Sequence, residues 1–254
     1  MLLDAVITVL REVLEAALVI ALFSLLAGRA GLRVWWAPLG LLLGIAGAWC
    51  YAVQLERFSA WADYTGQELV NAAIYVFVVG LMLVVAVLQR QGRVRAQPWL
   101  MVLAVAGILT REGSEVVIYL QGFVQGPGRT ESVLLGSCIG AGIGVSLGVV
   151  CYYLLAQSGQ AAVGLARGML ALFSAGLVTQ MVQMLVQADW LAGQLPFWDS
   201  SGLISESSLA GELLFALFSY EATPTLLQLQ AWLVTLLLFI LLPRAAGTGP
   251  RSSA

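Results

Sequence analysis

Long apolar runs alternate with short polar segments along most of the chain. Runs of about 20 apolar residues are long enough to cross a bilayer as helices. Seven such runs cover residues 5–27, 34–55, 69–89, 98–123, 132–156, 163–187 and 226–243. The chain is 60% hydrophobic and only 10% charged, whereas soluble domains carry about 25% charged residues. The pattern therefore predicts an all-α, polytopic membrane protein with seven transmembrane helices in a single domain.

Arginines gather on one side of this predicted topology. Eight of them, at positions 29, 33, 90, 93, 95, 167, 244 and 251, fall on the side that holds the C-terminal tail 244–254. Only Arg57 and Arg129 fall on the other side. Because cytoplasmic loops are enriched in basic residues, we predict an N-terminus outside the cell membrane and a cytoplasmic C-terminus.

Acidic residues show the opposite bias. Ten of them would lie outside or at the outer boundary, namely Asp4, Glu56, Asp63, Glu68, Glu131, Asp189, Asp199, Glu206, Glu212 and Glu221. This placement fits an outer vestibule that concentrates cations, and it also fits acidic residues at helix N-termini.

The composition excludes several chemistries. There is no histidine, which rules out His-based triads and His-ligated zinc or haem. All 12 basic residues are arginine, which rules out catalytic or P-loop lysines. The three cysteines lie in apolar stretches, and we predict them to be small buried hydrophobes rather than disulfides or metal ligands.

The first and fourth predicted helices carry charges near their centres. Both contain R-E-x-x-E, formed by Arg11, Glu12 and Glu15 and by Arg111, Glu112 and Glu115. A charge at the bilayer centre costs about 2.5–3.5 kcal/mol, so three cost about 8–10 kcal/mol per helix. Such helices must face a protein interior or a water-filled cavity.

The spacing of the motif indicates a cation site. The arginine and the last glutamate are four residues apart and can pair along one helix face, which the two glutamates share. One arginine neutralises one carboxylate, so each motif keeps surplus negative charge, and carboxylate oxygens prefer hard metal ions. We predict four metal-binding glutamates, with Arg11 and Arg111 balancing their charge. A buried salt bridge that only fixes helix packing is the alternative interpretation.

The motifs belong to a longer internal repeat. They lie 100 residues apart, and Gly47, Cys50 and Tyr51 recur as Gly148, Cys151 and Tyr152. Residues 1–97 and 98–187 thus form two three-helix repeats, followed by an outer loop at 188–225 and a seventh helix at 226–243. Because each repeat has an odd number of spans, the second is inverted relative to the first, as in many secondary transporters. Glycines at 136, 140, 144 and 148 predict a close-packing helix face.

Further polar side chains are candidates for the ion path or the outer vestibule. They are Glu68, Asn71, Tyr75, Gln180, Gln183, Asp189, Asp199 and Glu221. Alternatively, the polar side chains along one face of the third and of the sixth predicted helix only cross-link neighbouring helices. Residues 208–220 are a candidate interfacial helix at the outer surface.

On its two motifs, the chain resembles the oxidase-dependent iron permeases, which include fungal high-affinity permeases and bacterial permeases of elemental-iron uptake. The outer stretches Trp198-Asp199-Ser200-Ser201 and Ser219 to Thr225 are similar to the family's W-D-x-S and G-Y-x-x-x-P-S segments, with Ser219 and Thr225 replacing glycine and serine. The resemblance implies that Glu12, Glu15, Glu112 and Glu115 form the ion path. It also implies a companion iron-oxidising or iron-binding protein outside the membrane.

We therefore predict a permease, not an enzyme, that takes iron across the inner (plasma) membrane. Iron is its transported substrate, with no permanently bound cofactor and no nucleic-acid partner. If all four motif glutamates are ionised, they and the two arginines sum to a charge of −2, which balances ferrous iron. The oxidation state of the iron and the oligomeric state of the protein both stay open. The alternatives are a permease for manganese, lead or another divalent cation, a non-transporting assembly subunit, and an intramembrane glutamate protease.

Overall fold

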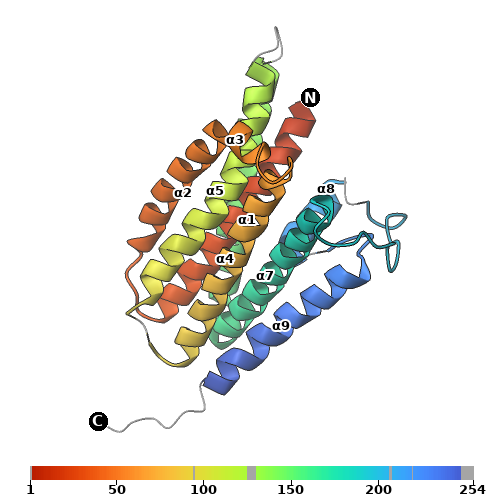
Figure 1. Ribbon diagram of the computed structural model, residues 1–254. Helices are drawn as coiled ribbons and strands as arrows, with labels where there is room; N and C mark the ends of the chain where they lie inside the picture. The colour runs from red at the N-terminus through yellow and green to blue at the C-terminus, as the bar shows by residue number, and fades with distance from the viewer. Residues whose placement is uncertain (1, 94, 125–129, 206–207, 219, 247–254) are drawn as a thin grey trace.

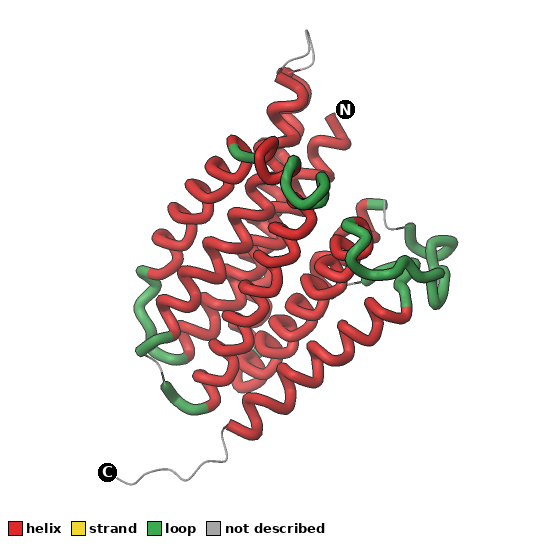
Figure 2. Tube along the Cα trace, viewed as in Figure 1, coloured by secondary structure: helices red, strands yellow, loops and turns green. Residues whose placement is uncertain are grey.

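The computed structural model describes residues 2–93, 95–124, 130–205, 208–218 and 220–246. These ranges contain helices and no β-strand, with one isolated bridge between Pro196 and Thr225. The helices are α1 (Leu2–Arg29), α2 (Trp36–Val53), α3 (Leu55–Ser59), α4 (Gly66–Arg90), α5 (Gln97–Val124), α6 (Thr130–Gln157), the 3-10 helix η1 (Gly159–Ala161), α7 (Ala162–Gln187), α8 (Leu209–Phe218) and α9 (Leu226–Ala246). The long helices run side by side and their loops gather at the two ends of the bundle (Figures 1 and 2).

Five helical segments are long and apolar enough to cross a membrane by themselves. They are Trp36–Val53, Gly66–Arg90, Thr130–Gln157, Gly159–Gln187 and Leu226–Ala246. The chain is therefore a multi-pass membrane protein. Two further helices of 28 residues, α1 and α5, carry the R-E-x-x-E motifs. The charges of these motifs make each helix unstable in lipid by itself.

The helix positions agree closely with the predicted apolar runs. The candidate interfacial segment 208–220 contains α8, while the short helices α3 and η1 were not predicted. Residues 247–254 of the predicted tail lie outside the described residues, as does Ser219. The start of α1 and the end of α9 lie at opposite ends of the bundle (Figure 1). We call the end that holds the start of α1 the α1-start end.

Two helix pairs pack most closely, α1 with α6 and α2 with α5. The predicted glycine face of α6 lies directly on α1: a Cβ atom at Gly140 would stand 3.0 Å from the backbone nitrogen of Leu10. On α2, Gly40 lies in the same way on α5, where a Cβ atom would stand 3.0 Å from Cβ of Val105. Small residues let membrane helices approach this closely, so the predicted packing role of the glycines is confirmed.

The opposite faces of α2 and α6 carry large exposed apolar side chains. Leu42 is 67% exposed and Leu135 59% exposed, as expected for surfaces that face lipid. Cys50 and Cys138 lie on exposed faces and all three cysteines are free. The predicted burial is wrong for these two, because the helices use glycine, not the larger residues, for their inner contacts, and Cys151 is only half-buried.

An apolar core fills the bundle between the motifs and the other end, where α1 and α4 end. Its fully buried members include Leu22, Phe23, Val78, Met82, Val85, Met101, Val105, Ile108, Leu170 and Leu177. On α4 this layer runs from Val78 to Ala86, which at 1.5 Å per residue is about 12 Å thick. The core therefore separates the charged motifs from the arginine-rich end.

Candidate metal site

The two R-E-x-x-E motifs meet where α1 lies against α5. Within α5, Arg111 pairs with Glu112 (Nη1 to Oε2, 2.5 Å) and with Glu115 (Nη2 to Oε1, 2.5 Å). The same guanidinium reaches across to α1, with Nη1 at 3.4 Å from Oε2 of Glu12. Arg111 is 5% exposed. One buried arginine thus holds three carboxylates from both motifs.

Arg11 has a different environment although its motif is the same. Its Nε atom lies 3.5 Å from Oε1 of Glu15, and its side chain is 33% exposed. Its guanidinium stands 5.1 Å from the ring centroid of Phe215 on α8, a cation–π contact. The predicted pairing of arginine and glutamate four residues apart is confirmed in both motifs. The two arginines are nevertheless unequal, because only Arg111 is enclosed between the helices.

Three glutamates form a compact cluster of oxygen ligands. One carboxylate oxygen each from Glu12, Glu112 and Glu115 lies within 4.8 Å of the others. Glu12 and Glu112 are buried, whereas the Glu115 side chain is 36% exposed. Glu15 is outside this cluster, buried beside Arg11, and neither of its oxygens has a hydrogen-bond partner. The arrangement offers a hard cation three oxygens of two helices, with a fourth buried carboxylate nearby.

Tyr75 of α4 ties the cluster to α7. Its hydroxyl lies 3.2 Å from Oε1 of Glu112 and 2.9 Å from Oε1 of Gln180, and it is fully buried. Its ring faces Arg111, with 5.1 Å between the guanidinium carbon and the ring centroid. Tyr75 therefore joins α4, α5 and α7 at the level of the motifs, immediately above the apolar core.

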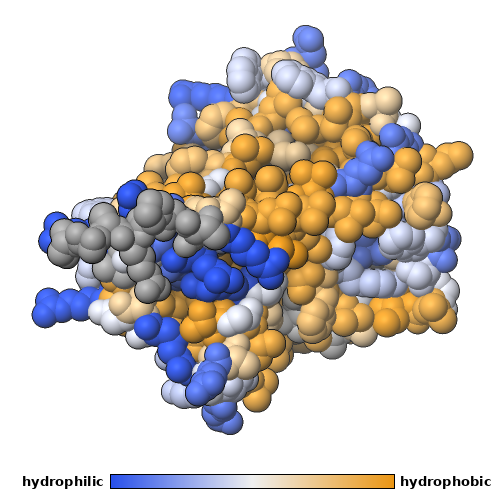
Figure 3. Space-filling view, turned by 90° about the horizontal axis from the view of Figure 1, so that it is seen from below, coloured by the Kyte–Doolittle hydropathy of each residue, from blue (hydrophilic) through white to orange (hydrophobic). Residues whose placement is uncertain are grey.

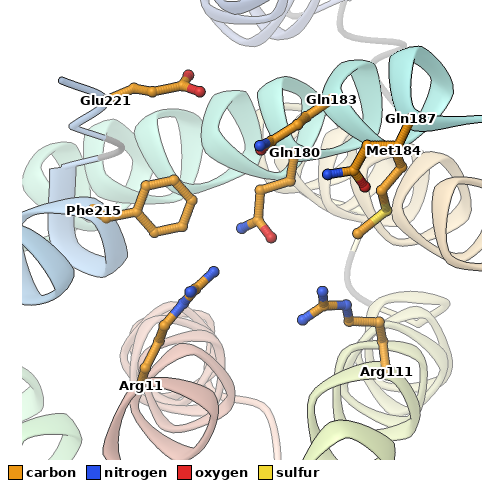
Figure 4. Close-up of a pocket in the computed structure, with 8 residues that line it drawn as sticks. All are labelled: Arg11, Arg111, Gln180, Gln183, Met184, Gln187, Phe215 and Glu221. Carbon is orange, nitrogen blue, oxygen red and sulfur yellow. The ribbon is translucent and has the colours of Figure 1, made fainter. Parts of the chain in front are cut away.

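A cavity of about 300 Å³ leads to the motif arginines. It is lined by Arg11, Arg111, Gln180, Gln183, Met184, Gln187, Phe215 and Glu221. Arg11 and Arg111 point into it from α1 and α5, opposite the glutamine side chains of α7 (Figure 4). Gln183 and Gln187 are exposed, so the cavity opens near the end of α7.

The other predicted path residues divide into two groups. Gln180, Gln183 and Glu221 line this cavity. Asn71 instead accepts a hydrogen bond from the hydroxyl of Tyr51 at 2.8 Å, and Glu68 is partly buried with its Oε2 lacking a hydrogen-bond partner. Phe215 was not among the predicted residues, because no spacing in the sequence relates α8 to Arg11.

Two acidic candidates of the outer loop lie away from the cavity. Asp189 is exposed at the end of α7, with a positive φ of 57°. Asp199 is exposed and accepts hydrogen bonds from the backbone and hydroxyl of Ser201, at 2.9 and 2.6 Å. These two bonds stabilise the ionised form and lower the pKa of the Asp199 carboxyl. Asp199 therefore shapes a turn in the loop.

The two family-like stretches of this loop pair with each other. The backbone nitrogen of Ser200 donates to the carbonyl of Ala222 at 2.9 Å, and that of Phe197 to Pro224 at 2.8 Å. Thr225 begins α9 as a hydroxyl cap, since its Oγ1 accepts from the nitrogen of Gln228 at 3.3 Å and donates to Oε1 of Gln228 at 2.8 Å. A threonine in place of serine thus keeps the cap.

Comparison with known proteins identifies the family. The model of the iron permease FTR1 family matches residues 94–246, well over half of the chain. The chain belongs to this family. The match includes the second motif, the α7 side of the cavity and the outer loop, and it confirms the resemblance seen in the sequence.

Full-length relatives of the permease are also known. It is 26% identical over 273 residues to the ferrous iron permease EfeU of Escherichia coli O6:H1 (strain CFT073), covering 96% of this chain and 97% of the relative. It is 27% identical over 269 residues to EfeU of Yersinia pestis, covering 92% of each. No solved structure matches the chain significantly. The relatives are named as permeases, which agrees with the prediction that the protein is not an enzyme.

Proposed function

We propose that this protein imports ferrous iron across the inner membrane through the glutamates of its two motifs. In this proposal all seven long helices span the bilayer, with the start of α1 outside and the end of α9 in the cytoplasm. The α1-start end is then the outer end. The family and the named ferrous iron permeases among the relatives support iron as the substrate.

The observation that carries the proposal is the glutamate cluster held by Arg111, which is itself one of the residues that line the cavity. Glu12, Glu112 and Glu115 bring ligand oxygens within 4.8 Å of one another, and they lie beside Arg111, which lines the cavity together with Arg11, three glutamines and Glu221. Carboxylates this close repel each other unless a cation or proton lies between them. A divalent ion entering from the cavity would relieve that repulsion.

The local charge favours a divalent ion. Three ionised glutamates with Arg111 sum to −2, which equals the charge a ferrous ion neutralises. Glu15, paired with Arg11 at 3.5 Å, contributes no further net charge. A ferric ion would leave a positive charge in a buried site, which is costly.

The packing supports the inverted repeat. In the proposed repeat, α1 corresponds to α5 and α2 corresponds to α6. A two-fold rotation that exchanges the repeats would therefore place the α1–α6 pair on the α5–α2 pair, and these are the two most closely packed pairs of the bundle. The contact glycines repeat at the same 100-residue offset as the motifs, since Gly40 and Gly44 of α2 match Gly140 and Gly144 of α6. Transporters of this plan bind substrate between their repeats.

The apolar core implies that this conformation is open to the outside only. An ion at the glutamates would meet about 12 Å of buried apolar side chains before the cytoplasmic end. Passage therefore requires the helices on the two sides of the core to move apart, as in a carrier with alternating access. An extracytoplasmic iron-oxidising or iron-binding partner stays a prediction from the family resemblance.

The test is uptake of radioactive iron by liposomes that contain the purified protein. Iron is supplied as ferrous iron with ascorbate or as chelated ferric iron. Glu12→Gln and Glu112→Gln remove cluster ligands, and Glu131→Gln at the exposed start of α6 is the matched control. We expect saturable ferrous uptake that falls at least tenfold in both cluster variants and is unchanged in the control.

Three results would count against the proposal. Uptake that is equal in cluster and control variants would exclude the glutamates as ligands. Preference for the ferric form would overturn the charge argument. Faster uptake of manganese or lead than of ferrous iron would assign the permease to the alternative metal.

A further inference from the structure

A second cavity lies at the arginine-rich end of the bundle, on the far side of the apolar core from the glutamates. It has a volume of about 280 Å³ and lies between α4, α7 and α9. Three arginines line it, one from each helix: Arg90, Arg167 and Arg244. The rest of its lining is apolar or glycine, namely Ala86, Gly164, Gly168, Ala171, Phe239, Ile240 and Pro243.

Among the described residues, no acidic side chain neutralises the positive charge of this cavity. None of the described residues that line it carries a carboxylate, and none of the ion pairs among the described residues involves these arginines. The charges of Arg90 and Arg167 repel each other, and the buried Nε of Arg167 has no hydrogen-bond partner. Three unpaired arginines around one hollow favour an anion, and they would repel an iron cation.

We propose that this cavity binds the phosphate headgroup of an anionic phospholipid from the cytoplasmic leaflet. Basic pockets between membrane helices on this side bind such headgroups, and arginine suits phosphate because its fork of N–H groups matches two oxygens. The inference rests on the orientation proposed above, and it does not depend on the transported ion.

The apolar surroundings distinguish a lipid from a free anion. Phe239 and Ile240 form one wall of the cavity, and the adjoining face of α9 exposes Leu237 (52%) and Leu241 (56%). An acyl chain can lie along this face while the headgroup enters between the arginines. Figure 3 shows this end of the molecule, where hydrophilic residues gather with hydrophobic residues around them.

Glycines provide the room for the headgroup. At Gly164 and Gly168 an added Cβ would meet no atom within 4 Å, so both leave open space on the side of α7 that lines the cavity. These glycines therefore differ from those of α6, which pack against a neighbouring helix.

The experiment measures lipid binding to the full-length protein in detergent by native mass spectrometry. Phosphatidylglycerol, phosphatidylcholine and inorganic phosphate are titrated separately. The double variant Arg167→Gln/Arg244→Gln removes two charges from the cavity. The matched double variant Arg33→Gln/Arg95→Gln removes two charges from exposed positions of the same end that do not line it.

Each arginine near an anionic lipid contributes about a fivefold change in affinity. We expect phosphatidylglycerol to bind more tightly than phosphatidylcholine, and the cavity variant to weaken it about 25-fold, with at most a twofold change in the control. If the double variant fails to fold, as judged by size-exclusion chromatography, the exposed Arg244→Gln alone should weaken binding about fivefold.

Three outcomes would overturn the inference. Equal weakening of phosphatidylglycerol binding in the two double variants would mean that the arginines attract the lipid only through the general positive charge of this end. Equal binding of phosphatidylcholine would remove the role of headgroup charge. Binding of inorganic phosphate that matches phosphatidylglycerol and depends on the same arginines would assign the cavity to a free anion.

Discussion

The unequal burial of the two motif arginines predicts unequal costs of removing them. Arg111→Met leaves three crowded carboxylates without the guanidinium that contacts them at 2.5, 2.5 and 3.4 Å. Removing one partner of a buried ion pair costs about 3–5 kcal/mol, because the remaining charge is left uncompensated. We therefore expect Arg111→Met to lower the free energy of unfolding by about 4 kcal/mol.

Arg11→Met should cost much less. Its one ion pair is the 3.5 Å contact with Glu15, which is buried, whereas Arg11 itself is 33% exposed; we expect the loss of this pair to cost about 1 kcal/mol, the upper value for exposed pairs. Its contact with Phe215 adds about 0.5–1 kcal/mol. A single isolated carboxyl can also be neutralised by one proton. The two variants should therefore differ by about 2–3 kcal/mol in the free energy of unfolding.

Thermal unfolding of the purified variants in one detergent measures this difference, with the fluorescence of the eight tryptophans as the signal. At about 2–4 °C per kcal/mol for a chain of this size, Arg111→Met should melt about 4–12 °C below Arg11→Met. Adding Glu112→Gln to Arg111→Met should recover part of the loss, because it removes one of the repelling charges. Equal melting temperatures for the two single variants would refute the asymmetry, and so would a larger loss for Arg11→Met.

Three further predictions concern residues outside the motifs. Gly140→Leu should lower the free energy of unfolding by about 1–3 kcal/mol, because the new side chain overpacks the contact with α1. Gly142→Leu is the control and should leave the free energy of unfolding unchanged, since a Cβ there meets no atom within 4 Å. Thermal unfolding measures both. Tyr75→Phe should reduce the apparent affinity for iron about two- to tenfold in liposome uptake, because it removes the hydroxyl that lies within hydrogen-bond distance of both Glu112 and Gln180. Unchanged affinity would exclude this positioning role. Thr225→Val should cost about 0.5–2 kcal/mol of stability and Thr225→Ser almost none, since only the hydroxyl caps α9.

The sequence predicted the helices because membrane helices have a strong local signal. A run of about 20 apolar residues must form a helix in lipid, where each backbone polar group needs an internal partner. The same reasoning found the two motifs, since buried charges in such runs are costly and stand out against leucine and valine. The pairing of Arg11 with Glu15 and of Arg111 with Glu115 followed from helical spacing alone.

The tertiary structure decided how the motifs differ. Arg11 and Arg111 have the same local sequence, but the packing of α1 against α5 encloses only Arg111 and brings Glu12 to it from 99 residues away. Phe215 reaches Arg11 by the fold of a loop that carries no periodic signal. Such contacts depend on helix rotation and loop path, which no local pattern specifies.

The arginine cavity shows the same division. The bias of arginines toward one end was evident in the sequence, since basic residues stay on the cytoplasmic side. Which of them share a cavity was not, because Arg90, Arg167 and Arg244 come from three helices whose ends meet only in the folded bundle. Local composition thus determined the spans and the charges, while helix packing decided which charges act together.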